Sequence, residues 1–174
     1  MPVKKKIVFI TGGARSGKSR FALEEALRVS GRKAFIATAE ESDDEMRERI
    51  NRHKQDRGEG WETYEEPLKI ADVLGEMEGD YGVVVIDCLT LWLANVMQSA
   101  LDVDAEIEQL ISSLARLSLP SVFIVSNEVG MGIVPENELA RRFRNVAGRL
   151  NQRVAGAADE VYVTLSGIPV KIKG

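Results

Sequence analysis

The stretch that decides the fold is Gly12-Gly13-Ala14-Arg15-Ser16-Gly17-Lys18-Ser19, which fits the pattern G-x-x-x-x-G-K-[ST]. It follows the apolar run Ile7–Thr11 and opens a helical pattern over Ser19–Val29, which is the strand–loop–helix context that this pattern requires. Glycines let backbone N–H groups curl around phosphates, Lys18 supplies positive charge for the outer phosphates, and the Ser19 hydroxyl is a ligand for Mg²⁺. The motif therefore predicts a phosphate-binding loop for a nucleoside triphosphate; the alternative is a glycine-rich turn that matches by chance.

Outward from this loop, apolar runs alternate with helical patterns. Strands are predicted at Ile7–Thr11, Ala34–Ala37, Val83–Asp87, Val122–Ser126, Val161–Leu165 and Val170–Lys173. Helices are predicted at Ser19–Val29, Asp43–Arg57, Leu68–Met77, Ala105–Leu117 and Glu136–Ala157, the last with a core-facing stripe of Leu139, Phe143, Val146, Leu150 and Val154. Most of the strands are continuous apolar runs, as in strands that are buried on both faces of a parallel sheet. We therefore expect a doubly wound, largely parallel α/β sheet with a C-terminal edge strand and with ligands at the carboxyl ends of the strands.

Composition narrows the class of protein. The 174 residues fit one domain over 1–174, and a formal net charge of −4 gives no global attraction to nucleic acid or to an anionic membrane. Cys88 is the only cysteine and lies in an apolar run, which excludes an intramolecular disulfide and favours a buried thiol; His53 is the only histidine, which excludes a multi-histidine metal site. The apolar stretch Ile7–Ile10 is too short for a membrane span or a signal-peptide core. We expect a cytoplasmic protein that neither binds nucleic acid nor spans a membrane.

An acidic residue ends one of the predicted strands. A second acid is expected at the end of a strand next to the phosphate loop, where it holds Mg²⁺ directly or through water. Asp87, at the end of the run Val83–Asp87, is the best candidate in the chain. The alternative is an aspartate that only caps a helix starting near Leu89.

The single histidine lies among cations in a predicted helix. Four-residue spacing brings Arg49, His53 and Arg57 to one helical face, and Arg52 and Lys54 flank that face. Nearby cations disfavour a protonated imidazole, so that a neutral nitrogen is available as a nucleophile, and the same cations bind triphosphate oxygens. Composition and spacing alone leave open the alternative of a solvated helix of mixed charge with an incidental histidine.

Several segments together resemble one family. They are Thr11–Ser19, Ile36–Ala39, Asp43–Met46, Arg52–Lys54, Ser126–Pro135 and Arg149–Arg153, of which Asn127–Pro135 is the most specific. The chain resembles, over nearly its whole length, the bifunctional adenosylcobinamide kinase / adenosylcobinamide-phosphate guanylyltransferases of cobalamin biosynthesis. The resemblance implies a RecA-like P-loop fold, a homotrimer and two successive reactions at one site.

The two reactions that the resemblance implies use the same substrate arm. First, the γ-phosphate of ATP or GTP is transferred to the hydroxyl of the aminopropanol arm of adenosylcobinamide. The family histidine, which matches His53, then attacks the α-phosphate of GTP and gives a GMP–histidine intermediate and pyrophosphate. The cobinamide phosphate finally takes the GMP and becomes adenosyl-GDP-cobinamide.

The resemblance also implies the residues of the site. The nucleotide contacts match Gly12, Gly13, Ala14, Arg15, Ser16, Gly17, Lys18, Ser19, Ala37, Thr38, Ala39, Lys54, Gln55, Asp56, Arg57, Glu65 and Asp87. His53 and Lys18 are the candidate catalytic residues, and Ser19 and Asp87 are the candidate Mg²⁺ ligands. The choice of Glu65 over the nearby Glu62 and Glu66 rests on the resemblance only.

Two other functions are compatible with a phosphate-binding loop. A simpler small-molecule or nucleoside monophosphate kinase would not need the histidine. A nucleotide-dependent switch or assembly ATPase would hydrolyse nucleotide slowly without an acceptor and would bind a protein partner. The segment Asn127–Pro135 follows a predicted strand end, so we expect a corrinoid-facing or subunit-contact loop there, with a plain connecting turn as the alternative.

Overall fold

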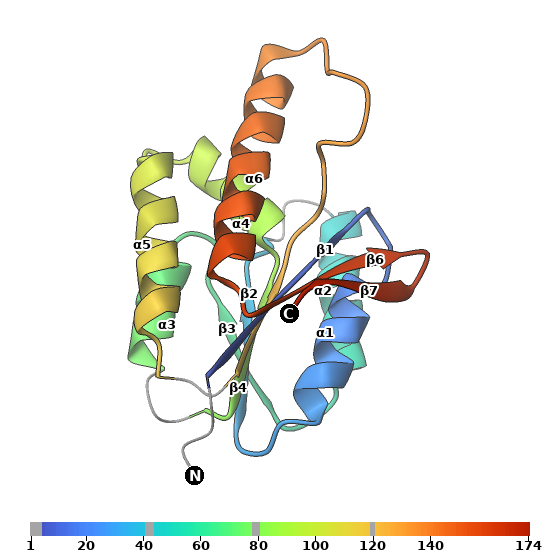
Figure 1. Ribbon diagram of the computed structural model, residues 1–174, viewed down its shortest axis with the longest axis vertical. Coiled ribbons are helices and arrows are strands. Elements are labelled where there is room, and N and C mark those ends of the chain that lie inside the picture. The colour runs from blue at the N-terminus through green and yellow to red at the C-terminus, as the bar shows by residue number, and fades with distance from the viewer. Residues whose placement is uncertain (1–4, 41–43, 78–80, 119–120) are drawn as a thin grey trace.

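The computed structural model describes residues 5–40, 44–77, 81–118 and 121–174. These residues build a seven-stranded sheet with the spatial order β3-β2-β4-β5-β1-β6-β7 (Figure 1). The strands are β1 (Lys6–Gly12), β2 (Lys33–Ala37), β3 (Trp61–Glu65), β4 (Val83–Asp87), β5 (Ser121–Val125), β6 (Glu160–Leu165) and β7 (Ile168–Lys173). β1 to β6 run parallel, and β7 pairs antiparallel with β6 at one edge. The predicted parallel sheet with a C-terminal edge strand is confirmed.

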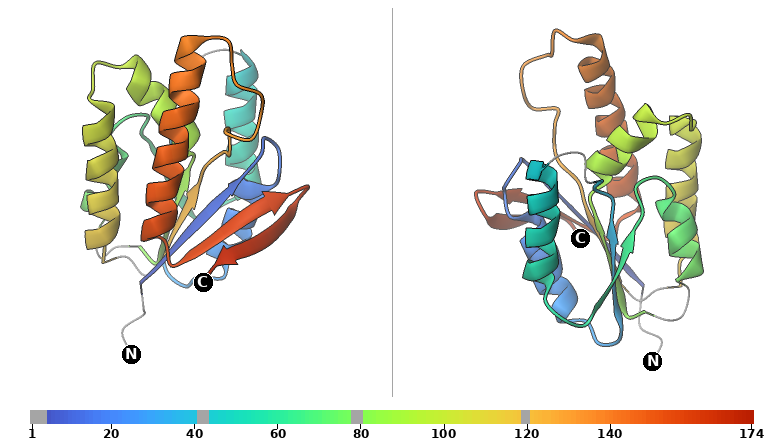
Figure 2. Two further views of the ribbon diagram at one scale, coloured as in Figure 1. Left: turned by 45° about the horizontal axis from the view of Figure 1, so that its top comes forward. Right: turned by 180° about the vertical axis from the view of Figure 1, so that it is seen from behind.

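Helices cover both faces of this sheet. They are α1 (Lys18–Leu27), α2 (Asp44–Arg57), α3 (Ile70–Glu76), α4 (Leu89–Gln98), α5 (Val103–Arg116) and α6 (Glu138–Ala157). Figures 1 and 2 show α1 and α2 on one face and α3 to α6 on the other. Alternate residues of β1 enter two separate apolar clusters, since Val8 and Ile10 pack with α1 while Ile7 and Phe9 pack with the α3–α6 side. The doubly wound arrangement is therefore confirmed.

Burial explains the sequence pattern of the strands. Residues 83–86 of β4 are 0% exposed, because helices cover this central strand on both faces. At the edge, β7 is exposed along its whole length. Pro169 is accommodated there, since an edge strand has one side on which no ladder hydrogen bond is needed.

Some predicted boundaries and one predicted contact were wrong. The helix expected from residue 136 begins at Glu138, with Asn137 Oδ1 accepting a hydrogen bond from Ala140 N at 3.1 Å. Leu139, expected in the core-facing stripe, is 63% exposed because the first turns of α6 extend beyond the sheet (Figure 1). Val146, Leu150 and Val154 are buried as predicted.

Strand β3 was not predicted, and it forms the edge of the sheet beside β2. Asp43, the expected first residue of the second helix, lies outside the described residues. Cys88 is 4% exposed, as expected for a buried thiol. None of the helices in the described part of the chain has the length and apolar character needed to cross a bilayer.

Candidate functional site

The loop between β1 and α1 has the backbone shape that its glycines permit. Gly12 has φ of 148° and Gly17 has φ of 92°, both in the range that favours glycine, and Gly17 is the N-cap of α1. A Cβ on Gly12 would lie 2.5 Å from Thr164 O. The two glycines of the motif are therefore required by the backbone, whereas a Cβ on Gly13 would meet no atom within 4 Å.

The loop is anchored from β6 and from the turn that follows it. Ser16 Oγ lies 2.6 Å from Thr164 Oγ1 in a buried hydrogen bond, and Gly167 N donates to Ser16 O at 3.1 Å. Lys18, only 6% exposed, donates from Nζ to Gly13 O at 2.5 Å. The lysine at the first turn of α1 therefore lies over the loop, where a phosphate would meet its charge.

Asp87 ends β4, and one of its carboxylate oxygens finds no partner among the residues that the structure describes. Asp87 Oδ2 is buried and makes no hydrogen bond within the described residues. A buried anionic oxygen without a partner is costly, so its surroundings fit a cation such as Mg²⁺. The alternative of a helix cap is wrong, because α4 has Cys88 as its N-cap and no side-chain cap hydrogen bond.

The position of Asp87 differs from the prediction in one respect. The acid was expected on a strand next to the phosphate-loop strand, but β5 lies between β1 and β4. The register still brings the strand ends level, since Val125 of β5 is the partner of both Ile10 and Asp87. Ser19, the other candidate metal ligand, is half-buried in the first turn of α1.

The carboxyl end of β2 is hydrogen-bonded to the backbone at Asp87. Ala37 pairs with Asp87 in the sheet, and Thr38 N donates to Asp87 O at 3.2 Å. The Thr38 hydroxyl donates to Cys88 O at 2.7 Å and accepts from Cys88 N at 2.8 Å. Thr38 is 0% exposed, so within this structure its side chain orients the backbone after Asp87; Ala39 follows it and is half-buried.

A polar pocket of about 490 Å³ lies between α2 and β3. It is lined by Lys54, Arg57, Gly58, Trp61, Thr63 and Glu65. Lys54 Nζ lies 2.5 Å from Glu65 Oε1, and the Arg57 guanidinium lies 3.9 Å above the Phe35 ring. Burial lowers the pKa of Arg57, and the Asp87 and Glu65 carboxylates partly offset that effect.

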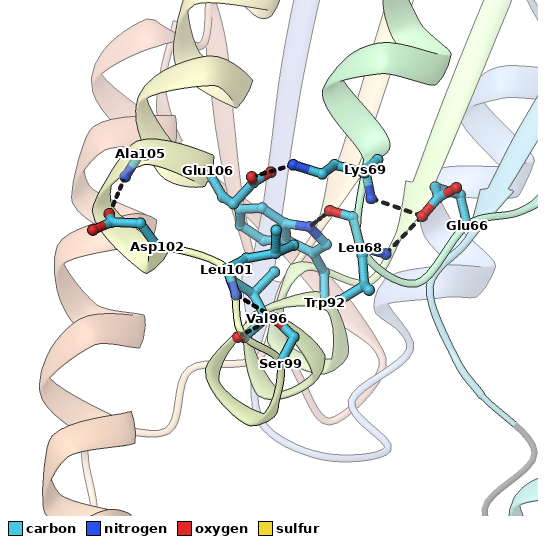
Figure 3. Close-up of polar contacts among 10 residues, drawn as sticks. All are labelled: Glu66, Leu68, Lys69, Trp92, Val96, Ser99, Leu101, Asp102, Ala105 and Glu106. Carbon is cyan, nitrogen blue, oxygen red and sulfur yellow. Dashed lines mark hydrogen bonds and ion pairs between the residues drawn. The ribbon is translucent and has the colours of Figure 1, made fainter.

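The segment after β3 is fixed by contacts from α4 and α5 (Figure 3). Glu66 Oε1 accepts from Leu68 N at 2.8 Å and from Lys69 N at 2.7 Å. Trp92 Nε1 donates to Leu68 O at 2.7 Å, and Lys69 Nζ lies 2.5 Å from the carboxylate of Glu106, which is 4% exposed. The hydrogen bond that Lys69 donates to the Glu106 carboxylate raises the pKa of Lys69. These contacts fix the carboxyl end of β3, where Glu65 stands.

The only histidine lies in α2, one turn before Arg57. Four-residue spacing along this helix places residues 49, 53 and 57 on successive turns, as predicted. The side chains of Arg49, His53 and Asp56 lie outside what the structure describes, and that of Gln55 is exposed.

Most of the candidate residues thus lie at the carboxyl ends of the strands, along the side of the sheet where these ends meet. Glu65, Ala37 and Asp87 occupy matching register positions at the ends of β3, β2 and β4, and the phosphate loop follows β1 at the same edge. The sequence missed the anchor residues Thr164 and Gly167, which lie far from the loop along the chain and carry no local signal.

Residues 8–172 match a family model described as cobinamide kinase / cobinamide phosphate guanyltransferase. The chain is 41% identical over 182 residues to the "Bifunctional adenosylcobalamin biosynthesis protein CobU" of Escherichia coli (strain K12), covering 96% of this chain and 99% of that protein. It is 42% identical over 168 residues to the "Bifunctional adenosylcobalamin biosynthesis protein CobP" of Pseudomonas aeruginosa, covering 95% and 96%.

Among solved structures, the RadB recombinase superposes with a TM-score of 0.51 at 13% sequence identity, covering 91% of this chain and 73% of that one. At this identity the likeness concerns the fold alone. It confirms the RecA-like P-loop architecture that the motif and the resemblance implied.

Proposed function

The chain belongs to the cobinamide kinase / cobinamide phosphate guanyltransferase family of bifunctional transferases, and we propose from this that it phosphorylates adenosylcobinamide with ATP or GTP and then transfers GMP from GTP to the product. The observation that carries the proposal is that the phosphate loop, Asp87 and Glu65 all lie at the carboxyl ends of strands, on the same side of the sheet. A triphosphate held at Gly12–Ser19 then extends along this edge toward the pocket between α2 and β3.

In the kinase step, the substrate hydroxyl oxygen attacks the γ-phosphorus and the nucleoside diphosphate leaves. Lys18 and the backbone N–H groups at the start of α1 bind the phosphate oxygens and stabilise the charge that develops on them. Ser19 and Asp87 would hold Mg²⁺, which neutralises phosphate charge when it is bound. Asp87 Oδ2, which has no hydrogen-bond partner in the described part of the chain, supports this assignment.

In the guanylyl step, a nitrogen of His53 attacks the α-phosphorus of GTP, a phosphoramidate bond forms and pyrophosphate leaves. A phosphate oxygen of the cobinamide phosphate then attacks the same phosphorus, and His53 is released. Lys54 and Arg57 follow the histidine closely in the sequence and line the pocket between α2 and β3. They supply positive charge for the nucleotide phosphates. Arg57 is 8% exposed, and this burial strengthens its attraction for an anion.

Both steps are proposed to occur in one domain formed by residues 1–174 and in a homotrimer. The exposed apolar side chains after β5 support an interface between copies of this chain, since Met131 is 89% and Ile133 is 96% exposed. Sedimentation of the protein and of Ile133→Asp tests this interface, because a charged residue there should shift a trimer toward monomer. The cytoplasmic location expected from the sequence stays a prediction.

The proposal is tested with Mg²⁺ and GTP labelled at the α-phosphate, followed by denaturation and a search for protein-bound label. We expect acid-labile, base-stable label that disappears in His53→Ala and persists in the control Asn51→Ala, which changes an exposed residue of the same helix. Absence of label with cobinamide still phosphorylated would leave a simple kinase. Absence of both activities would refute the proposal and favour a nucleotide-dependent switch.

A further inference from the structure

Four polar residues at the carboxyl end of β5 form a hydrogen-bonded network. Ser126 Oγ donates to Asn151 Oδ1 at 2.8 Å, and Asn151 Nδ2 donates to Asn127 O at 3.1 Å. Asn127 N donates to Thr90 Oγ1 at 2.7 Å. Thr90, Ser126 and Asn151 are 9%, 2% and 7% exposed, so three buried side chains, from α4, from the residue after β5 and from α6, converge on one backbone segment.

The network holds the backbone of Asn127 and leaves its side chain available. The N–H group of Asn127 is bound by Thr90 and its carbonyl by Asn151. Its half-buried side-chain amide makes no hydrogen bond to any residue in the described ranges. Buried polar side chains ordinarily serve to satisfy or orient other groups. Here they orient one residue whose own amide is free to bind a ligand.

Asn127 lies beside the first residue of the phosphate loop. Ser126 N donates to Ile10 O at 3.0 Å and Glu128 N donates to Gly12 O at 2.9 Å, so pairing with β1 continues beyond the end of β5. On the other side of β5, Val125 pairs with Asp87. Asn127 therefore lies between Gly12 and Asp87 along the edge of the sheet.

Strand alternation assigns Asn127 to the face of the sheet that carries α1. Val125 packs in the same cluster as Ala22 and Ala26 of α1, whereas Ser126 points to α6 through its bond to Asn151. The next residue in the alternation returns to the α1 face. Asp87 belongs to that face for the same reason, since Val83 and Val85 are in the α1 cluster.

We propose that the side-chain amide of Asn127 donates a hydrogen bond to the terminal phosphate of the bound triphosphate, and that Thr90 and Asn151 are positioning residues for it. An amide N–H group suits a phosphate oxygen, and Asp87 already supplies the carboxylate for a cation. Lys18 and a cation held by Asp87 would both act on the outer phosphates, so a donor between these two residues would face the outermost phosphate. The inference rests on the proposed use of a triphosphate and adds a residue to it.

The test compares the affinities for GTP and GDP, measured by calorimetry with Mg²⁺ and without any corrinoid, in the His53→Ala background so that no GMP–histidine adduct forms during the measurement. One hydrogen bond to a charged group corresponds to roughly a tenfold to hundredfold change in binding. We expect Asn127→Ala to lose about that factor for GTP and to keep its GDP affinity, while the control Asn145→Ala, an exposed residue of α6, changes neither. If Asn127→Ala leaves the ratio of GTP affinity to GDP affinity unchanged, the proposal is overturned, whether both affinities stay the same or both fall by the same factor.

The positioning role is tested with a pair of matched variants. Thr90→Val keeps the shape but removes the oxygen that accepts from Asn127 N, whereas Thr90→Ser keeps that oxygen. We expect Thr90→Val to lower the ratio of GTP affinity to GDP affinity about twofold to tenfold. The separate variant Thr90→Ser should keep the wild-type ratio. In the Asn127→Ala background, Thr90→Val should have no further effect on the ratio. A Thr90→Val variant that lowers only the melting temperature contradicts the positioning role.

The outcome is separate from that of the proposed function. If the wild-type protein does not turn over cobinamide but Asn127→Ala still lowers the GTP-to-GDP ratio, the inference stands and the substrate assignment fails. If cobinamide is turned over and the ratio is unchanged, the substrate assignment stands and the inference fails.

Discussion

Replacing Gly12 with alanine tests whether the phosphate loop is held against β6. Gly12 has φ of 148°, a conformation that costs an L-residue about 1–3 kcal/mol. The added Cβ would also lie 2.5 Å from Thr164 O and 2.6 Å from Thr164 Oγ1. Since the first of these is a backbone atom in a paired strand, relief requires a shift of β1 against β6, and overpacking of this kind costs about 1–3 kcal/mol.

The two effects together predict a loss of about 2–6 kcal/mol in the free energy of unfolding for Gly12→Ala. For a chain of this size the melting temperature should fall by about 4–24 °C. Urea denaturation and calorimetry without nucleotide measure both quantities.

Gly13→Ala is the matched control for this prediction. Gly13 does not have a positive φ, and its Cβ would meet nothing within 4 Å. We expect a change of less than about 1 kcal/mol. If the two alanine variants are equally stable, the contact between the loop and β6 does not constrain the backbone and the reasoning is refuted.

Three further predictions concern charged residues. Asp87→Asn should raise the Mg²⁺ concentration needed for half-maximal GTP binding by about tenfold or more, because the orphaned carboxylate oxygen is the proposed ligand; an unchanged Mg²⁺ dependence in a titration would contradict that role. Arg57→Gln should slow guanylyl transfer more than it weakens GTP binding, as measured by adduct formation and calorimetry, and equal losses would count against a catalytic role for the cations of α2. Burial raises the pKa of Glu160, but hydrogen bonds from Lys171, Lys6 and Tyr162 outweigh it and hold the pKa below its usual value. The stability that ionised Glu160 contributes is therefore fully present above the ordinary glutamate pKa and is lost as pH falls through its lower pKa in the folded protein. Between pH 5 and about 3, the free energy of unfolding of Glu160→Gln, measured by urea titration, should fall less than that of the wild type.

The sequence predicted the elements whose signal is local. The phosphate loop was recognised because Gly12, Gly17, Lys18 and Ser19 are close together in the chain, and the central strands because burial on both faces produces runs such as Val83–Ile86. Strand β3 was missed because its residues are half-buried or exposed at an edge and include two glutamates. The aromatic and β-branched residues Trp61, Thr63 and Tyr64, which favour strands, were the available signal.

The site was less predictable than the fold because its supports come from distant residues. The order of strands in the sheet is not encoded locally, so the insertion of β5 between β1 and β4 could not be foreseen from Asp87. Thr90, Asn127 and Asn151 belong to three separate segments, and only their hydrogen bonds join them. The roles of His53 and Glu65 came from resemblance, and these roles stay predictions.

The bond between Ser16 and Thr164 has a consequence for biosynthesis. These residues are 148 positions apart, and β1 is flanked by β5 and β6, both of which are translated long after it. A ribosome-bound chain that ends before residue 160 therefore has its phosphate loop already made but without the neighbour that shapes it. Such a nascent chain should acquire nucleotide affinity only when its final segment emerges from the ribosome. Pulse-labelled chains stalled at residue 150 should therefore not bind to a GTP resin, whereas the finished chain should bind.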